Sequence, residues 1–198
     1  MTLIEQFFIA LDEQWPTFAA KQPIRIIGSS ALMLQTSYTR GTSDSDVFET
    51  HDLSEAAKKR LLAIAGKDSA LHKRRSMYID VVANGIPFLP ASPLWHPVDL
   101  NANLSKLEVF ALDVVDVVVS KLRAARVQDF DDIREMVERG LVQHASLLDR
   151  FNLALPHLVD SADGENAYSC IESLHRVERD LLRVAETPIE LPNWLTEL

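Results

Sequence analysis

The sequence predicts an α+β fold, with a small sheet in the first part of the chain and helices in the rest. Short segments with the composition or alternation of strands occur at residues 24–27, 44–49, 77–83 and 106–112. Beyond residue 113 the apolar spacing becomes helical, over roughly 113–126, 129–139, 145–159 and 165–185. We therefore expect an α/β core over 1–112 and a helical region over 113–198 packed on that core.

The helices expected before residue 113 follow from periodicity and capping. Residues 3–15 place apolar side chains at helical spacing, and Pro16 limits that helix. The composition of 29–35 suits a short helix. A further helix is expected from about 53 to 65, with Asp52 or Ser54 as its cap.

The remaining segments are expected to be loops or packed helix. A proline-rich loop is expected from Pro87 to Pro97, and Gly140 and the turn 161–164 separate the later helices. The tail is expected to be irregular, with Trp194 folding back onto the body. Cys170 lies in a helical pattern and is expected to be packed.

Composition excludes several classes of protein. The 198 residues carry 20 basic and 29 acidic side chains, a net charge of −9, and 47% are hydrophobic, which excludes general disorder. One cysteine excludes an internal disulfide framework. A pI near 5.1 argues against tight, sequence-independent nucleic-acid binding. Glu5 and Asp12 interrupt the first apolar run, so we expect no signal peptide, no membrane span and a cytoplasmic protein.

Two short motifs could carry chemistry. The strand at 24–27 ends in Gly28 and Ser29 at a helix start, where free backbone N–H groups and the helix dipole favour a phosphate. The alternative is a simple turn. Asp44 and Asp46 are two residues apart, so on a strand they point to the same side with Cα atoms about 6.6 Å apart. They could converge on a divalent cation, or they could be a solvated pair.

Asp80 is a third candidate carboxylate. It lies among apolar residues in the strand 77–83, where an acid is paired, bound to a metal or exposed at an edge. Three carboxylates in one cleft would repel each other by about 4 kcal/mol per pair at a separation of about 4 Å. Such a cluster needs a divalent cation or a shared proton.

These motifs in this order resemble the nucleotidyltransferase superfamily. The first block carrying the resemblance is Gly28-Ser29-Ser30-Ala31-Leu32 with Arg40-x-Thr42-x-Asp44-x-Asp46. The second is 107–113 with Asp116, Ser120-Lys121-Leu122, Arg126 and Asp129. The chain is similar to the minimal bacterial proteins called DUF6036 and to the abortive-infection (AbiEii) toxin-like group. Ser45 departs from the apolar residue usual between the two acids, and the gap from Ser29 to Asp44 is long.

The resemblance implies a small mixed β-sheet with flanking helices and a Mg²⁺- or Mn²⁺-dependent transfer of a nucleoside monophosphate (NMP) from a nucleoside triphosphate (NTP). It implies that Asp44, Asp46 and Asp80 hold the metal ion, and that Asp80 also takes the proton of the attacking hydroxyl. The nucleotide would be bound by Gly28, Ser29, Ser30, Arg40 and Lys121. No Walker P-loop is present, which disfavours a conventional ATPase.

Two interpretations remain open for each of Arg40, Lys121 and the basic run 72–75. Arg40 could bind the same phosphates or brace the acidic strand. Lys121 emerges from an apolar helix face, so it either extends past the core to solvent or reaches a cleft facing phosphates. Asp116 and the pair Arg126 and Asp129 are expected to brace helices. The basic run 72–75 could attract an acceptor or be a solvated loop. The histidine spacing does not favour a zinc site.

Two functions remain open from the sequence. The first is an enzyme that modifies a hydroxyl of tRNA or of a protein, as a toxin-like component. The second is a catalytically silent module of the same fold that binds a nucleotide or a partner protein. The helices after Gly140 could serve as an interface for a cognate antitoxin or for a second copy of the chain.

Overall fold

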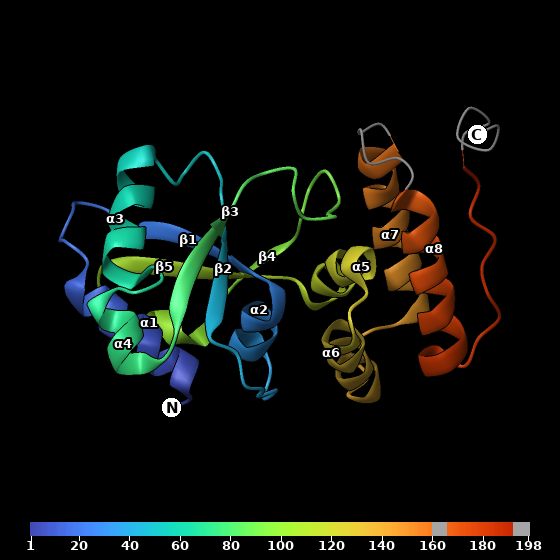
Figure 1. Ribbon diagram of the computed structural model, residues 1–198, viewed down its shortest axis with the longest axis horizontal. Helices are drawn as coiled ribbons and strands as arrows, with labels where there is room; N and C mark the ends of the chain where they lie inside the picture. The colour runs from blue at the N-terminus through green and yellow to red at the C-terminus, as the bar shows by residue number, and fades with distance from the viewer. Residues whose placement is uncertain (160–165, 192–198) are drawn as a thin grey trace. The chain divides into compact units, whose positions relative to one another are not determined.

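The computed structural model describes residues 1–159 and 166–191 (Figure 1). The chain divides into two compact units. The first comprises Met1–Pro87 and Leu94–Asp113, and the second comprises Phe88–Pro93 and Val114–Leu198. The α+β fold predicted from the sequence, with a mixed sheet and a C-terminal helical segment, is confirmed. The expected turn 161–164 and Trp194 lie outside the described residues.

The first unit is built on a mixed sheet of five strands in the order β3-β2-β1-β5-β4. Their bounds are Gln22–Ile27 (β1), Asp44–Phe48 (β2), Tyr78–Val82 (β3), Trp95–Pro97 (β4) and Leu107–Leu112 (β5). Strand β1 runs parallel to β5 and antiparallel to β2. Strand β2 runs parallel to β3, and β4 runs antiparallel to β5.

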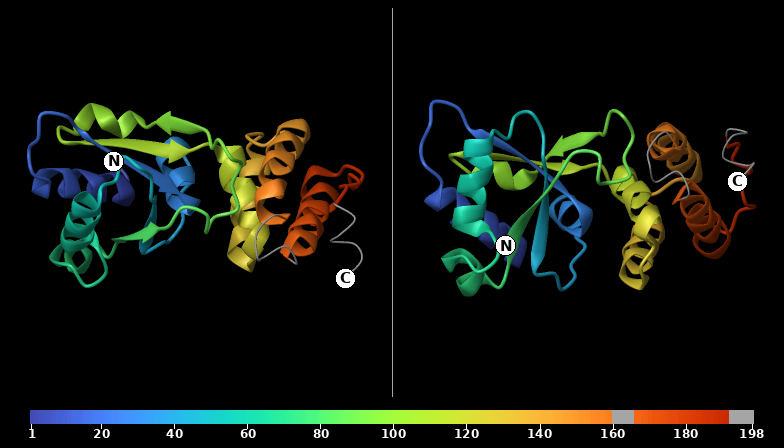
Figure 2. Two further views of the ribbon diagram at one scale, coloured as in Figure 1. Left: turned by 90° about the horizontal axis from the view of Figure 1, so that it is seen from above. Right: turned by 45° about the horizontal axis from the view of Figure 1, so that its top comes forward.

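Four α-helices and one 3₁₀ helix complete this unit: α1 (Leu3–Gln14), α2 (Gly28–Gln35), α3 (Glu55–Ala65), α4 (Ala70–Arg75) and η1 (Asp99–Asn103). Thr2 caps α1 through a capping box with Glu5, and the Ser54 hydroxyl accepts a hydrogen bond from the N–H of Ala57 at the start of α3. Helices α1, α3 and α4 lie together on one side of the sheet, while α2 lies at the end of β1 (Figure 2).

The two faces of the sheet differ sharply in burial. One face carries side chains that are completely or almost completely buried: Ile24, Ile26, Ser45, Val47, Ile79, Leu107, Val109 and Ala111. The opposite face is buried at Ile27, Phe48 and Leu112 but carries Arg25, Asp46, Asp80 and Phe110, none of which is fully buried. The alternation of side chains along each strand therefore separates a core face from a face that can receive a ligand.

A buried carboxylate joins α1 to the start of β5. Asp12 is 5% exposed and accepts hydrogen bonds from the backbone N–H groups of residues 105–107 and from the Ser105 hydroxyl, at 2.8 to 3.1 Å. Burial alone would raise the pKa of Asp12, but these hydrogen bonds outweigh it and the pKa is lowered. The carboxylate thus satisfies donors that the strand start leaves without a backbone partner.

Three short elements were not predicted from the sequence. The basic run 72–75, for which a solvated loop was one of two interpretations, lies in α4. This helix begins where the Ser69 hydroxyl accepts a hydrogen bond from the N–H of His72, and it buries only Leu71. The proline-rich segment contains β4, in which Pro97 is tolerated because β4 is an edge strand that pairs only with β5. The third is η1, a single short 3₁₀ helix.

The second unit is helical in its described part: α5 (Val114–Ala124), α6 (Val127–Glu138), α7 (His144–Val159), α8 (Asn166–Val177) and a π-helical turn, η2 (Glu178–Leu182). The helix predicted over 165–185 is therefore α-helical up to Val177 and continues as the π-helical turn η2. The Asp116 carboxylate on α5 pairs with the Arg150 guanidinium on α7, which braces the two helices as expected. The Phe88 ring packs edge-on against Phe151 of α7, with centroids 5.7 Å apart. Cys170 is buried, and burial raises the pKa of its thiol to about 11.

We expect Ser45→Ala to stabilise the protein. The Ser45 side chain is fully buried on the apolar face of the sheet, and its hydroxyl has no hydrogen-bond partner among the described residues. Removing an unsatisfied buried hydroxyl should raise the free energy of unfolding by about 1 kcal/mol, measured by urea denaturation followed by circular dichroism.

Ser30→Ala is the matched control, because the Ser30 hydroxyl is also buried but donates a hydrogen bond to the Asp44 carbonyl at 3.2 Å. It should lower the free energy of unfolding by about 1 kcal/mol. Equal losses of stability in both variants would contradict the assignment of Ser45 as unsatisfied.

Candidate active site

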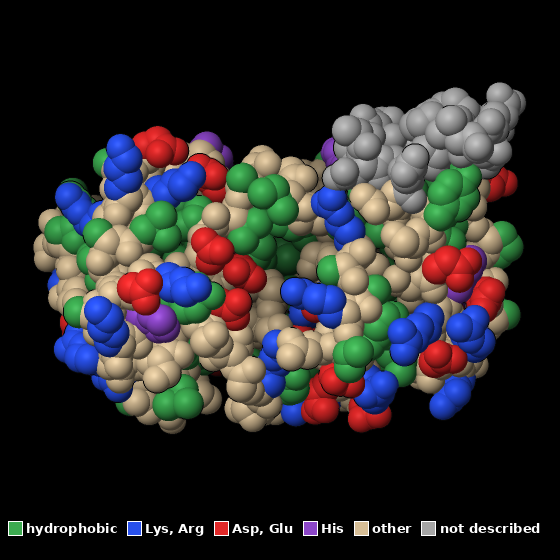
Figure 3. All heavy atoms as spheres, viewed as in Figure 1, with side chains coloured by type: hydrophobic (Ala, Val, Ile, Leu, Met, Phe, Trp, Pro, Cys, Tyr) green, Lys and Arg blue, Asp and Glu red, His purple; other side chains and the backbone are tan. Residues whose placement is uncertain are grey.

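Three carboxylates lie on the ligand-accessible face of the sheet. Asp44 and Asp46 are separated by one residue on β2, so both point to that face, as the spacing predicts. Asp80 on β3 is the register partner of Asp46, and register partners on adjacent strands lie side by side about 4.8 Å apart. Asp44 and Asp80 are exposed and Asp46 is half-buried. Acidic side chains gather over β2 and β3 in the space-filling view (Figure 3).

Local hydrogen bonds hold two of these carboxylates. The Thr42 hydroxyl donates to Asp44 Oδ1 at 2.6 Å, and Asp80 Oδ1 accepts the N–H of Val81 at 2.9 Å. In this conformation the oxygens do not converge, since no three His, Cys, Asp or Glu side chains within residues 1–159 and 166–191 form a group that could hold a metal ion. The strands bring the three residues to one face, but the side chains are not arranged as a ligand shell.

Gly28 stands where β1 passes into α2, directly beside the carboxylates. Its φ of +66° lies in the left-handed region, which a side chain disfavours. A Cβ atom at this position would lie 3.2 Å from Asp46 Oδ2. Glycine therefore permits both the turn and the close approach of the helix start to Asp46.

The first residues of α2 face the start of β2. The N-cap residue of α2 is Ile27, whose side chain makes no capping hydrogen bond to the helix. Ser30 is buried and its hydroxyl binds the backbone of Asp44, so Ser30 fixes α2 against β2. Ser29 is half-buried at the turn, and half-buried Arg40 lies in the loop between α2 and β2. Gly28 and Ser30 thus place the start of α2 next to Asp44 and Asp46.

A family model described as a nucleotidyltransferase of unknown function, DUF6036, matches residues 6–157. The chain belongs to the DUF6036 family. The match includes every candidate residue at the sheet and Lys121 of α5. No curated protein and no solved structure matches the chain. No described helix of this DUF6036 protein is long and apolar enough to cross a membrane.

Lys121 lies in the second unit, within a buried cluster of charges. Its ammonium is 3.0 Å from Asp129 Oδ1 and 2.8 Å from Asp132 Oδ2, and the three side chains are 8%, 4% and 0% exposed. Arg126 adds a second cation, because its backbone N–H and its Nε both donate to Asp129 Oδ2. Burial would raise the pKa of Asp129, but the hydrogen bonds and charges of Arg126 and Lys121 lower it. The cluster joins α5 to α6, and binding of phosphate by Lys121 stays a prediction.

Sequence reasoning overlooked a group of residues on the same sheet face as the carboxylates. The Arg25 guanidinium donates to the Thr50 hydroxyl at 3.2 Å and pairs with the Asp52 carboxylate at 2.5 Å, which lowers the pKa of Asp52. Two aromatic rings, Trp95 and Phe110, lie 5.8 and 5.7 Å from the guanidinium carbon. The sequence feature that could have revealed this group is Arg25, a charged residue between two isoleucines in a short strand.

The donor chemistry of the carboxylate face fits a divalent cation. Carboxylate oxygens are the ligands that Mg²⁺ prefers, and the register of β2 and β3 places three of them on one face beside a helix start. Gathering them would require Asp80 to exchange its hydrogen bond with the Val81 N–H for the ion.

We expect Gly28→Ala to impair nucleotide binding beyond its cost in stability. A residue with a side chain at this φ should lower the free energy of unfolding by about 1 to 2 kcal/mol, and the added Cβ should displace the Asp46 carboxylate. Affinity for an NTP, measured by calorimetry, should fall.

Gly140→Ala is the control, since Gly140 has a similar φ of +70° with no atom within 4 Å of the added Cβ. It should show the loss of stability alone. If the two variants bind nucleotide equally well, the close approach at Asp46 is irrelevant to binding.

We expect Lys121→Met to destabilise the protein strongly. The change leaves Asp129 and Asp132 buried without their shared cation, which should cost about 3 kcal/mol of unfolding free energy. Arg134→Met, which removes an exposed pair with Asp131 on the same helix, should change stability by less than about 0.5 kcal/mol. A small effect of Lys121→Met on stability with a large loss of nucleotide affinity would instead support the phosphate role.

Proposed function

We propose that this protein transfers an NMP from an NTP to a hydroxyl group of an acceptor. The observation that carries the proposal is the side-by-side placement of Asp46 and Asp80 on one sheet face, next to the glycine-dependent start of α2. Membership of a nucleotidyltransferase family supports the same reaction class. The reaction demands positioning and neutralisation of charge more than covalent chemistry, and both demands suit this arrangement.

The start of α2 would bind the polyphosphate. The dipole of the helix favours negative charge at this end, and its N-cap residue Ile27 offers no polar side chain to the helix start. Gly28 lets the backbone approach closely, while Ser29 and Arg40 would add a hydroxyl and a cation. The β- and γ-phosphates are therefore expected at the Gly28 end of the face.

Asp44 and Asp46 would hold the divalent cation, Mg²⁺ or Mn²⁺, with Asp80 as the third ligand. When bound, this ion would neutralise the charge that develops on the phosphoryl oxygens. Asp80 would accept the proton of the attacking hydroxyl. The acceptor oxygen forms a bond to the α-phosphorus, the bond from that phosphorus to the bridging oxygen breaks, and pyrophosphate leaves with the electron pair.

We expect Asp46→Asn to abolish transfer while leaving the fold intact. The test incubates the protein with labelled NTPs, Mg²⁺ and either total cellular RNA or total cellular protein, and measures label in the acceptor and pyrophosphate released. Loss of one charged ligand should reduce the rate by about 100-fold or more. Asp149→Asn, an exposed carboxylate on α7, serves as the matched control and should retain the wild-type rate.

A silent binding module is the second candidate function. It is favoured by the hydrogen bond of Asp80 to the Val81 N–H, which turns one oxygen away from a shared ion. Nucleotide binding by the wild-type protein, without label transfer to any acceptor or release of pyrophosphate, would establish this second function and overturn the first.

A further inference from the structure

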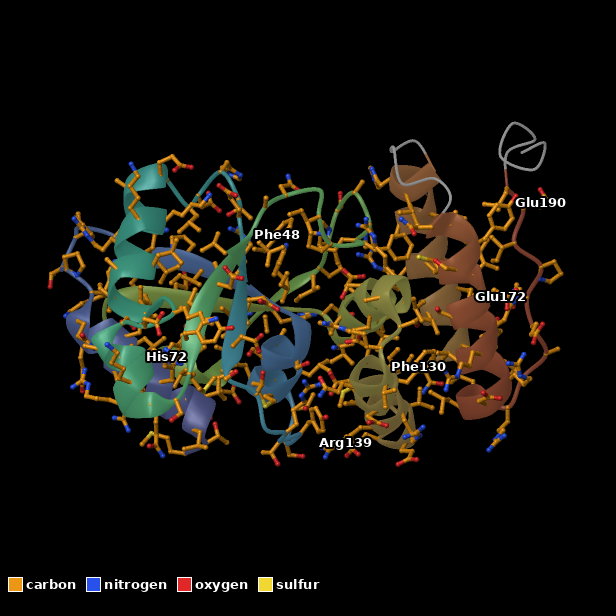
Figure 4. The ribbon with its side chains drawn as sticks, in the orientation of Figure 1. Phe48, His72, Phe130, Arg139, Glu172 and Glu190 are labelled. Atoms are coloured by element: carbon orange, nitrogen blue, oxygen red, sulfur yellow. The ribbon has the colours of Figure 1, made fainter. Side chains whose placement is uncertain are left out.

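An aromatic stack adjoins the carboxylates on the same face of the sheet. Phe48 follows Asp46 by two residues on β2, so its side chain points to the same side. The Phe48 ring stacks against Trp95 of β4, with centroids 5.8 Å apart and planes 25° apart. Figure 4 shows Phe48 beside β2 near the strand β4. We call Phe48, Trp95 and the adjacent Arg25 the aromatic platform.

The platform is held together by its own contacts and is partly exposed. Phe48 is 8% exposed, and it is covered in part by Trp95, which is only half-buried. The Arg25 side chain is 22% exposed and is held by Asp52 and by the rings of Trp95 and Phe110. Trp95 keeps part of its side chain exposed, and that exposed part is the surface on which another flat ring could stack.

The in-line geometry of phosphoryl transfer assigns an occupant to this platform. The leaving pyrophosphate lies at the Gly28 end of the face, so the attacking hydroxyl must approach the phosphorus from the opposite end. Along β2 that end is the position of Phe48, about 6.6 Å beyond Asp46. The sugar and base of the donor nucleotide are attached off this axis. The platform therefore lies where the acceptor, rather than the donor, must arrive.

We propose that the aromatic platform binds the terminal base of a ribonucleotide acceptor, placing the hydroxyl of its sugar over Asp46 and Asp80. This inference rests on the proposed function for the direction of attack. Bases stack on aromatic and guanidinium planes whatever their sequence. The base would lie on the exposed part of Trp95, and the sugar would extend from it past Phe48 towards Asp46. A tyrosine side chain fits this geometry less well, because its hydroxyl is on the ring itself. A stacked tyrosine would therefore hold its oxygen over the platform and away from Asp46 and Asp80.

The negative charge of the protein restricts binding to the terminal nucleotide of the acceptor. The chain has a net charge of −9, and the face carries three aspartates, so long contact with a phosphate backbone is disfavoured. Stacking of one terminal base needs no neutralised phosphates. Binding should therefore depend weakly on salt, which separates the platform from the exposed basic residues of α4 as the binding surface.

The test measures binding of a single-stranded RNA pentamer, and of the same pentamer with an abasic 3′ nucleotide, in the absence of NTP. Wild-type protein should bind the intact pentamer at least about fivefold more tightly. Trp95→Leu should remove this difference and Trp95→Phe should retain it. Phe18→Leu is the matched control, since Phe18 is an exposed ring that also lies against an arginine, Arg60. Phe48→Leu, checked for folding by circular dichroism, provides a second variant.

The outcomes separate the platform from the reaction. Equal affinity for the two pentamers, or equal effects of Trp95→Leu and Phe18→Leu, would overturn the platform even if transfer occurs. Transfer to a tyrosine-containing protein in place of RNA would overturn it as well. If base-dependent binding is observed but no nucleotide is transferred to any acceptor, the platform stands as a base-binding site and the proposed reaction fails. In an active enzyme, Trp95→Leu should raise KM for the RNA about fivefold or more with little change in kcat.

Discussion

The parallel pairing of β2 with β3 is the constraint on which the candidate site depends. Its register sets Asp46 opposite Asp80 and Val47 opposite Val81. A shift of one residue would turn Asp80 towards the buried face, where an unpaired carboxylate is costly, and would expose Ile79. The apolar alternation that builds the core therefore also directs the carboxylates to the accessible face. Core and site are consequences of one pattern.

Much of the fold could be predicted because its main elements have strong local signals. The strands and most of the longer helices follow from periodicity and caps, such as Ser54 at α3. The short elements α4 and β4 could not be predicted in this way. Helix α4 buries a single leucine, and β4 gains its structure only from pairing with β5, which lies beyond the intervening 3₁₀ helix η1. Tertiary contacts supply what the local pattern lacks.

The candidate site could be predicted only in part, because some of its features are local in the sequence and others depend on contacts between distant residues. The Asp-x-Asp spacing and the glycine at the strand end are local, so their shared face and the turn at Gly28 could be anticipated. The neighbours of Lys121 could not, because Asp129 and Asp132 come from the following helix and reach it only when α5 and α6 pack. The stack of Phe48 on Trp95 likewise joins strands that are 47 positions apart in the chain.

The path of the chain has a consequence for any attempt to isolate the sheet. Residues 88–93 belong with the helical unit, although residues on both sides of them belong with the sheet. A polypeptide ending at Asp113 would keep Phe88 but lose Phe151, the ring against which it packs. Such a fragment would display an orphaned apolar surface and tend to self-associate. Producing the first unit alone would also require a polar linker in place of residues 88–93.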